Sequence, residues 1–290
     1  MDRKRVPGPE LTVPPLVEYA LDQKRWSPQE ECRHDANRQP EDLRPIYLKT
    51  GLISQASGSA YIELEKTKIA CGVYGPRPIK KSGYGFSGTG TLNCEFKFAT
   101  FACVKRRNHI RDPQERELSM ILTQALTPAV RLELLPKSAI DVYITVLECD
   151  GLSSCFAAAI TAASVALAHA GIEMIDLVAA CSASYVIMDR TLSSAVPPPS
   201  TTSDSAPAAV SLRPPTIIMD ADLEEEKFEE GSIMVAYMPS LNEVTHVLQN
   251  GKVDRSIVSQ SVEHCIEACN KIYAVMRHAL VESIDEKQTR

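Results

Sequence analysis

The chain has 290 residues, of which 44% are hydrophobic and 23% charged, enough to bury a sizeable core in one large or two small domains. Its net charge of −6 argues against nucleic-acid binding over the whole surface, and the absence of a run of about 18 apolar residues argues against a membrane span. The nine cysteines are scattered, so we expect reduced, buried thiols and neither disulfides nor zinc. Cys265 and Cys269 share a helix face near His264, where core packing explains them better than a metal.

Residues 1–40 are rich in proline and charge without periodicity, which predicts an extended arm. Apolar alternation then predicts three strands, at 46–53, 59–65 and 68–75. The loop at 79–90 contains a formal GxGxxG, but residues 91–101 alternate like a strand where a dinucleotide site needs a helix. We therefore reject the dinucleotide interpretation.

The middle of the chain predicts a helix over 114–134, with a break near Thr127 because Pro128 falls inside it. Residues 138–151 alternate as a strand, and the alanine-rich run 157–170 predicts a tightly packed helix that ends at Gly171. A strand at 177–189 precedes a Pro/Ser/Thr/Ala-rich segment at 196–215, which we interpret as a disordered insertion.

The C-terminal part predicts further strands at 216–220, 232–239 and 242–253, then an amphipathic helix over 256–281. Most strands follow one another directly, which indicates an α+β fold with one mixed sheet. We expect one domain, at 41–285.

An anion site is conceivable where the strand at 138–151 meets the following helix. The N-terminus of a helix offers unpaired N–H groups and a partial positive charge. An enzyme would normally place a cation beside them, yet no Lys or Arg occurs between Ser138 and Asp189. The turn reads LSSC (152–155), and we interpret its two serines as helix caps.

Basic residues concentrate between Pro76 and Arg116, where the sequence contains nine basic and three acidic residues. Phe96, Phe98 and Phe101 lie just upstream of the run KRR (105–107). Basic and aromatic side chains together suit a single-stranded nucleic acid, and a solvated loop is the alternative. The candidate RNA-binding residues are Arg77, Lys80, Lys81, Lys105, Arg106, Arg107 and Arg111.

Four blocks resemble the RNase PH superfamily in the same order along the chain: 43–77, 125–151, 160–183 and 238–253. They look closest to the RNase-PH-like subunits of the eukaryotic RNA exosome ring, and 51–63 and 170–183 are most similar to its mRNA-transport-regulator type. The resemblance implies an RNase PH-like fold (ribosomal protein S5 domain 2-like), a single α+β domain with a mixed sheet and packed helices.

Active members of that superfamily degrade RNA from its 3′ end by phosphorolysis and hold phosphate with the Arg and Thr of a DGGTRTA-like turn. The matching turn here, DGLSSCF (150–156), lacks the cation. Active members also carry two acidic residues six positions apart. Glu225 or Glu226 could match the first, but the second falls on Gly231 or Ser232, which have no carboxylate. This departure from the pattern of the active members implies that the chain has no catalytic residue and binds no metal or cofactor.

Three hypotheses remain open. The first is a structural, RNA-guiding subunit in a hetero-hexameric ring of RNase PH-like exosome subunits. Its partners would be those subunits, cap subunits, an associated exonuclease and RNA, in the nucleus, nucleolus and cytoplasm. The second is an active phosphate-dependent 3′-to-5′ exoribonuclease whose cation comes from Arg116 or a neighbouring chain. The third is a small-molecule or protein-binding module without RNA contact. The cation-free stretch 138–189 favours the first hypothesis.

Overall fold

The computed structural model describes residues 10–12, 33, 38–79, 88–108, 110, 112–186 and 215–288. Most of the predicted arm and of the predicted insertion at 196–215 lies outside these residues. So do three of the candidate RNA-binding residues, Lys80, Lys81 and Arg111. The domain boundaries therefore stay a prediction.

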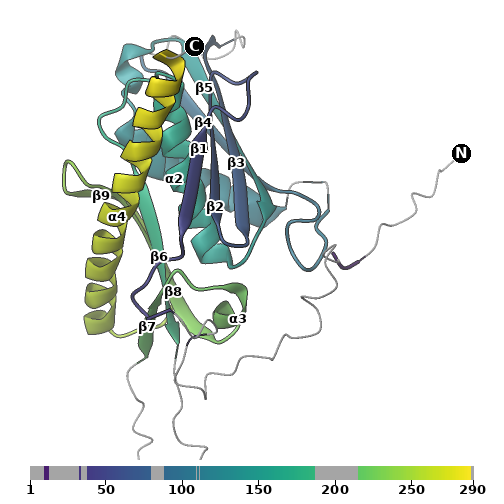
Figure 1. Ribbon diagram of the computed structural model, residues 1–290, viewed down its shortest axis with the longest axis vertical. Helices are drawn as coiled ribbons and strands as arrows, with labels where there is room; N and C mark the ends of the chain where they lie inside the picture. Colours follow the sequence, from purple (N-terminus) through teal and green to yellow (C-terminus); the bar gives the residue numbers. More distant parts are fainter. Residues whose placement is uncertain are drawn as a thin grey trace, which may run out of the picture.

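The strands form two sheets (Figure 1). The first contains, in spatial order, β1 (Ile46–Thr50), β2 (Gly58–Leu64), β3 (Thr67–Pro78), β5 (Ser138–Glu148) and β4 (Thr91–Phe98). Its pairs are antiparallel except β4 and β5, which are parallel, so this sheet is mixed. The second, antiparallel sheet contains β7 (Thr216–Met219), β6 (Ala179–Val186), β8 (Glu229–Met238) and β9 (Glu243–Gly251).

The prediction of one mixed sheet is therefore corrected to two sheets. The strands themselves lie close to where apolar alternation placed them. Alternation reports which face of a strand is buried, but it carries no information about which strand lies beside it. The division into two sheets depends on those pairings.

The helices are α1 (Pro113–Leu126), α2 (Leu152–His169), α3 (Leu223–Glu226) and α4 (Arg255–Gln288). The predicted helix 114–134 ends at Leu126 and continues as two short 3₁₀ turns, which confirms the break near Thr127. Helix α2 begins at Leu152 instead of Ala157, so the LSSC segment is its first turn.

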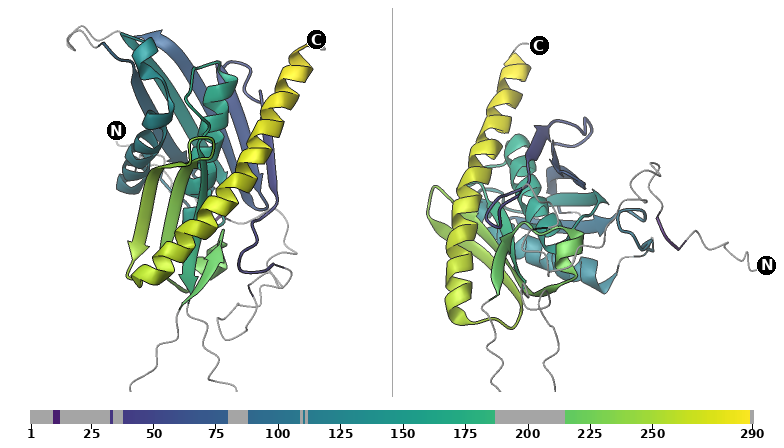
Figure 2. Two further views of the ribbon diagram at one scale, coloured as in Figure 1. Left: turned by 90° about the vertical axis from the view of Figure 1, so that its left-hand side faces the viewer. Right: turned by 60° about the horizontal axis from the view of Figure 1, so that its bottom comes forward.

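Helix α2 lies between the two sheets (Figure 2), where it packs against β2 and β3 on one side and β6 and β8 on the other. Gly58 of β2 permits this close approach, because a Cβ on it would lie only 2.4 Å from the carbonyl oxygen of Ala166. The helix is long and apolar enough for a membrane span, but 78% of it is buried inside the fold, which accounts for its composition.

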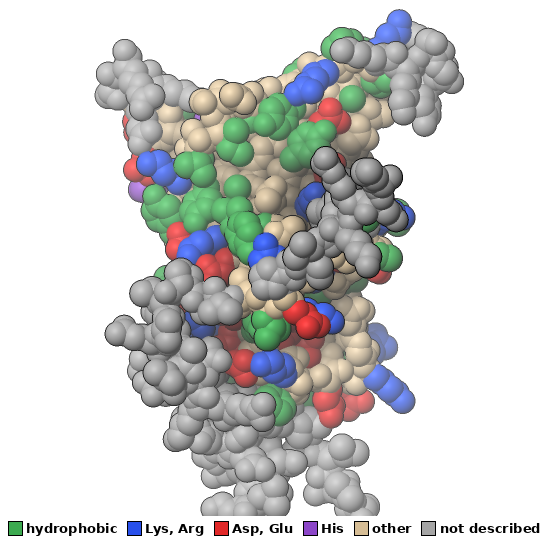
Figure 3. Space-filling view, turned by 90° about the vertical axis from the view of Figure 1, so that its right-hand side faces the viewer, with side chains coloured by type: hydrophobic (Ala, Val, Ile, Leu, Met, Phe, Trp, Pro, Cys, Tyr) green, Lys and Arg blue, Asp and Glu red, His purple; other side chains and the backbone are tan. Residues whose placement is uncertain are grey.

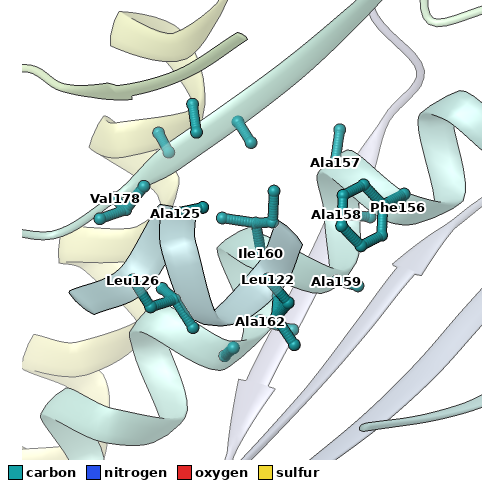
Figure 4. Close-up of a cluster of buried hydrophobic side chains, with 14 of the residues drawn as sticks. Leu122, Ala125, Leu126, Phe156, Ala157, Ala158, Ala159, Ile160, Ala162 and Val178 are labelled. Carbon is teal, nitrogen blue, oxygen red and sulfur yellow. The ribbon is translucent and has the colours of Figure 1, made fainter. Parts of the chain in front are cut away.

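The hydrophobic core fills the space around α2 (Figure 4), where α1 contributes Leu122 and Leu126 and α2 contributes Phe156 and Ile160. Helix α4 packs against β6 and β8 from the other side of the second sheet. Cys265 and Cys269 of α4 are fully buried, which confirms that they serve core packing.

Candidate functional site

The turn between β5 and α2 is built on Gly151. Its φ of +98° is a conformation that side chains with a Cβ rarely adopt. A Cβ there would also lie 2.7 Å from the carbonyl oxygen of Ala221. Glycine therefore lets the chain turn sharply out of β5, so that the first N–H groups of α2 face the loop that carries α3.

The N-terminus of α2 is occupied by a carboxylate of the same chain. The backbone N–H groups of Leu152 and Ser153 each donate to one oxygen of Glu226, both at 2.8 Å. Asp150 holds the same loop through its Oδ1, which accepts from the N–H of Leu223 at 3.3 Å. An internal anion thus satisfies two of the N–H groups that a helix start leaves unpaired.

The two serines of this turn do not cap α2, so that prediction was wrong. The Oγ of Ser153 donates to the Oγ of Ser232 at 3.3 Å, and the Oγ of Ser154 accepts from Arg44 at 2.7 Å. Glu226 offers two charged oxygens to adjacent N–H groups, an arrangement that one hydroxyl cannot match.

Arg44 is the cation that sequence reasoning missed. Its side chain is fully buried beside the turn, and it donates to both carboxylate oxygens of Asp220, at 2.9 and 2.8 Å. Asp150 lies 3.5 Å from the same guanidinium. Arg44 is more than a hundred residues away in sequence, and only its position just before Pro45 and an apolar strand hinted at burial.

The pKa values in this cluster follow from burial and pairing. Burial alone would raise the pKa of Asp220, but the Arg44 guanidinium outweighs it and holds that pKa below its ordinary value. Burial would lower the pKa of Arg44, and Asp220 reverses this and raises it. Asp150 lies farther from the guanidinium, and burial raises its pKa. The positive charge of Arg44 is therefore already paired with the carboxylates of Asp220 and Asp150 inside the fold.

The two glutamates that could match a catalytic acid are both engaged in the fold. Glu225 forms a buried ion pair with Arg33, with Nε–Oε1 and Nη2–Oε2 distances of 3.0 and 2.9 Å. Glu226 binds the start of α2. Ser232 lies at this site, because its Oγ accepts from the Oγ of Ser153. It is one of the two residues that the match to active members aligned with the second acid, and it has no carboxylate.

The cavity enclosed beside this cluster is small. A cavity of about 20 Å³ is lined by residues that include Arg44, Ser154 and Asp220. That volume accommodates roughly one water molecule. Among the described residues, no group of three or more His, Cys, Asp or Glu side chains is placed to hold a metal ion.

The predicted basic segment is divided between two ends of the first sheet. Arg77 pairs with Ala139 near the start of β5, whereas the loop at 99–107 follows Phe98, which pairs with Val146. Seven residues of strand separate the two positions, or about 23 Å. Arg77 instead lies over the ring of Tyr74, at 5.1 Å from its centroid.

The loop at 99–107 lies beside the turn that begins α2, because the N–H of Cys149 donates to the carbonyl of Ala102 at 3.0 Å. Lys105 and Arg106 are exposed there, and their backbone pairs with the segment 10–12 of the arm. The exposure of their side chains is what contact with an anionic partner would require.

Arg107 is used inside the fold. Its guanidinium lies 4.0 Å from the centroid of the Phe98 ring and donates to the side chain of Gln114 at 3.1 Å. Phe96 and Phe98 are buried in the core, and of the three phenylalanines only Phe101 is exposed, at 53%. The predicted aromatic and basic surface is therefore reduced to Phe101, Lys105 and Arg106 within this loop.

A second candidate surface is the outer face of the first sheet, opposite the face on which α2 packs. The strand register places Tyr47, Tyr61, Tyr74 and Tyr143 on it, around a strip formed by Ala70 and Gly72. Figure 3 shows hydrophobic side chains gathered on the upper half of this face. Tyr47 and Tyr143 are 55% and 44% exposed.

Comparisons with known proteins agree with this architecture. Residues 42–173 match the family model described as 3′ exoribonuclease family, domain 1. The chain is 36% identical over 284 residues to the exosome complex component mtr3 of Schizosaccharomyces pombe, which covers 97% of this chain and 96% of that protein. It is 36% identical over 294 residues to the exosome complex component MTR3 of Homo sapiens, with 97% and 95% covered. The crystal structure of rice (Oryza sativa) Rrp46 has the same fold, with a TM-score of 0.66 at 22% identity, over 84% of this chain and 98% of that one.

Proposed function

Because the chain belongs to the RNase PH family of 3′ exoribonucleases and exosome components, we propose that it is a non-catalytic subunit of an RNA exosome core ring. In that role it supports 3′-to-5′ RNA processing and decay and helps to guide RNA. The observation that carries the non-catalytic assignment is the Glu226 carboxylate on the N–H groups of Leu152 and Ser153. A phosphate needs those same donors.

Electrostatics support this assignment. Phosphorolysis brings inorganic phosphate against an RNA phosphodiester, and two anions in a poorly solvated pocket repel one another strongly. The cation nearest the turn, Arg44, already pairs with Asp220 and Asp150. Arg116, which the alternative hypothesis invoked, is exposed on α1. The arrangement offers a phosphate more negative charge than positive.

The outer face of the first sheet supports an assembly. Its four tyrosines form the kind of surface that usually marks an interface. Two of the charged groups on this face are paired, Lys68 with Glu148 at 3.0 Å and Asp141 with the amide of Asn93 at 3.0 Å. An aromatic face with paired charges suits a protein neighbour, and we propose that a sister RNase PH-like subunit covers it.

The remaining partners follow from the same proposal. Cap subunits, an associated exonuclease and RNA would be reached through the assembled ring, in the nucleus, the nucleolus and the cytoplasm. The exposed Lys105 and Arg106 support contact with RNA, since each phosphate that they neutralise releases condensed counterions.

The assignment is tested by assaying the purified chain, and the ring that contains it, on single-stranded RNA with and without inorganic phosphate. We expect no nucleoside diphosphate release and no hydrolysis that depends on this chain. Ser154→Arg alone should not create activity, because the second carboxylate is also missing at Gly231 or Ser232. Phosphate-dependent release by wild type, abolished by altering this chain alone, would establish the catalytic alternative.

A further inference from the structure

Two thiols meet where the loop at 99–107 lies beside the end of β5. The N–H of Cys149 donates to the carbonyl of Ala102 at 3.0 Å, which holds the loop against the strand and places Cys103 next to Cys149. Their side chains are close enough for a thiol–thiol hydrogen bond. Both are free thiols, and both are partly exposed at the margin of the core. The proposed function gives neither of them a role.

The surroundings of Cys103 let a small reagent reach it but keep its reactivity low. The flanking Phe101 and Val104 are 53% and 62% exposed. The Nε of Arg107 donates to the Sγ of Cys103 at 3.3 Å, a contact that favours the thiolate. The hydrogen bond with Cys149, and then burial, outweigh this contact and raise the pKa of Cys103 above its ordinary value. Most of the thiol is therefore protonated at neutral pH, and its reactions there are slow.

We infer that Cys103 and Cys149 are a redox pair, which a small-molecule disulfide such as oxidised glutathione converts into an internal disulfide. The Cys103 thiolate attacks the small disulfide, forms a mixed disulfide and releases one small thiolate. The Cys149 thiolate then attacks the Cys103 sulfur and releases the second. In total the protein loses two protons and two electrons, and the small disulfide takes up both and leaves as two thiols.

The second step is favoured because it joins side chains that are already in contact. An intramolecular reaction between groups held in place needs no further encounter, so the mixed disulfide should be short-lived and the internal disulfide should accumulate. The new bond would tie the loop that carries Lys105 and Arg106 to the connection between β5 and α2. Oxidation would therefore restrain these two exposed cations relative to the rest of the fold. This inference does not rest on the proposed function.

Other thiols of the chain serve as internal controls. Cys155 lies within hydrogen-bonding reach of Cys149 but is fully buried. Cys181 and Cys265 form a second pair in contact, and both of its members are buried. A reagent reaches none of these three sulfurs while the chain stays folded, so their oxidation would report unfolding.

The test incubates the full chain, within any complex with which it co-purifies, with oxidised glutathione for hours at about pH 8, where more of a thiol is ionised. Free thiols are then alkylated and the peptides are analysed by mass spectrometry. We expect one new species, a disulfide that joins the peptides of Cys103 and Cys149, while Cys181 and Cys265 stay alkylated. In Cys149→Ser, Cys103 should stop at the mixed disulfide with glutathione. In Cys155→Ser, the internal disulfide should still form.

Hydrogen exchange measures the restraint. Peptides covering residues 99–107 should exchange more slowly in the oxidised protein and return to the original rate after a dithiol reductant is added. Equal exchange in the two states would overturn the restraint of the loop.

The redox pair itself is overturned by any of three results in the wild type. Cys103 could stay alkylated throughout, it could carry as much mixed disulfide as in Cys149→Ser, or either cysteine could bond to a different cysteine of the chain. If a serine variant does not fold, oxidation of Cys181 and Cys265 reveals it, and the wild-type result alone then decides.

Discussion

At the scale of single residues, two buried arginines organise the region that the sequence marks as cation-free. Arg33 donates to the Glu225 carboxylate and to the backbone carbonyls of Met219 and Asp220. Arg44 pairs with Asp220 and reaches the first turn of α2 through Ser154. Both guanidinium groups come from the N-terminal part of the chain and lie among carboxylates and carbonyls. Their positive charge is therefore balanced by groups within the fold.

Breaking the Arg44 pair should be costly. In Arg44→Leu, Asp220 keeps a buried charge without its partner, which typically lowers the free energy of unfolding by about 3–5 kcal/mol. The double variant Arg44→Leu/Asp220→Leu removes both charges and should be the more stable of the two. Thermal unfolding of the co-purified complex measures the order. If the double variant melts at a lower temperature than the single one, the stabilising effect of Arg44 does not come from its ion pair with Asp220.

Asp220 should also make stability depend on pH. Its pKa is lowered in the folded state, so its contribution is complete above the unfolded value of about 3.9 and is lost as the pH falls through the folded value. We expect wild type to lose stability below about pH 4, and Asp220→Asn to be less stable at pH 7 with a flatter acid limb. Melting curves between pH 3 and 7 would show this, and parallel curves for both proteins would contradict it.

At the scale of elements, local patterns predicted the strands and the order of the helices, because apolar alternation and proline act within a few residues. The start of α2 at Leu152 was missed because its acceptor, Glu226, lies over seventy residues away. Serines at a helix start normally suggest capping, and nothing local shows that a distant carboxylate has replaced them. The pairing of Arg44 with Asp220 was missed for the same reason.

The loop at 99–107 also shows how one run of basic residues divides its roles. Lys105 and Arg106 are exposed, whereas Arg107 stacks on Phe98 and binds Gln114. Burial against an aromatic ring cannot be read from the letters KRR alone. The three residues should therefore respond differently to substitution.

Replacing Lys105 and Arg106 with alanine should weaken RNA binding by the assembled complex and reduce the slope of log K against log salt by about 1.4, or about 0.7 for each phosphate contact. Arg107→Ala should chiefly lower thermal stability. Arg131→Ala removes an exposed arginine that pairs with Glu173 and serves as the control. Fluorescence anisotropy over a salt series separates these effects. An unchanged slope in the double variant would assign the two residues to solvent or to another subunit.

At the scale of the molecule, the helices of the described residues leave the outer face of the first sheet uncovered, except where Ile53 and Ala56 lie beside Gly72. Helix α2 packs against β2 and β3 from the inner side. The outer side carries the tyrosines, and the sheet ends in two edge strands, β1 and β4. Unpaired edges and a broad aromatic face both favour association. The fold therefore predicts that this chain is stable only with partners.

Tyr143→Glu places a charge at the centre of that face and should abolish co-purification with a sister subunit, because an unpaired carboxylate would be desolvated in the interface. Ile175→Glu is the control, since Ile175 is 55% exposed but lies in the connection between α2 and β6, where its N–H donates to the carbonyl of Ala129 at 2.7 Å. Co-expression followed by affinity capture measures retention of the partner. Equal retention of the partner by both variants would show that the interface lies on another surface.

Expressed alone, the chain should aggregate or bind a chaperone, and co-expressed with a sister subunit it should become soluble at a fixed stoichiometry. Obligate interfaces commonly bury upwards of about 2,000 Å², and such a contact makes apparent stability rise with partner concentration. Sedimentation and melting curves over a concentration series test this expectation. A monomer that stays soluble and melts sharply at a temperature independent of concentration would show that the outer face is stable in water and needs no partner to cover it.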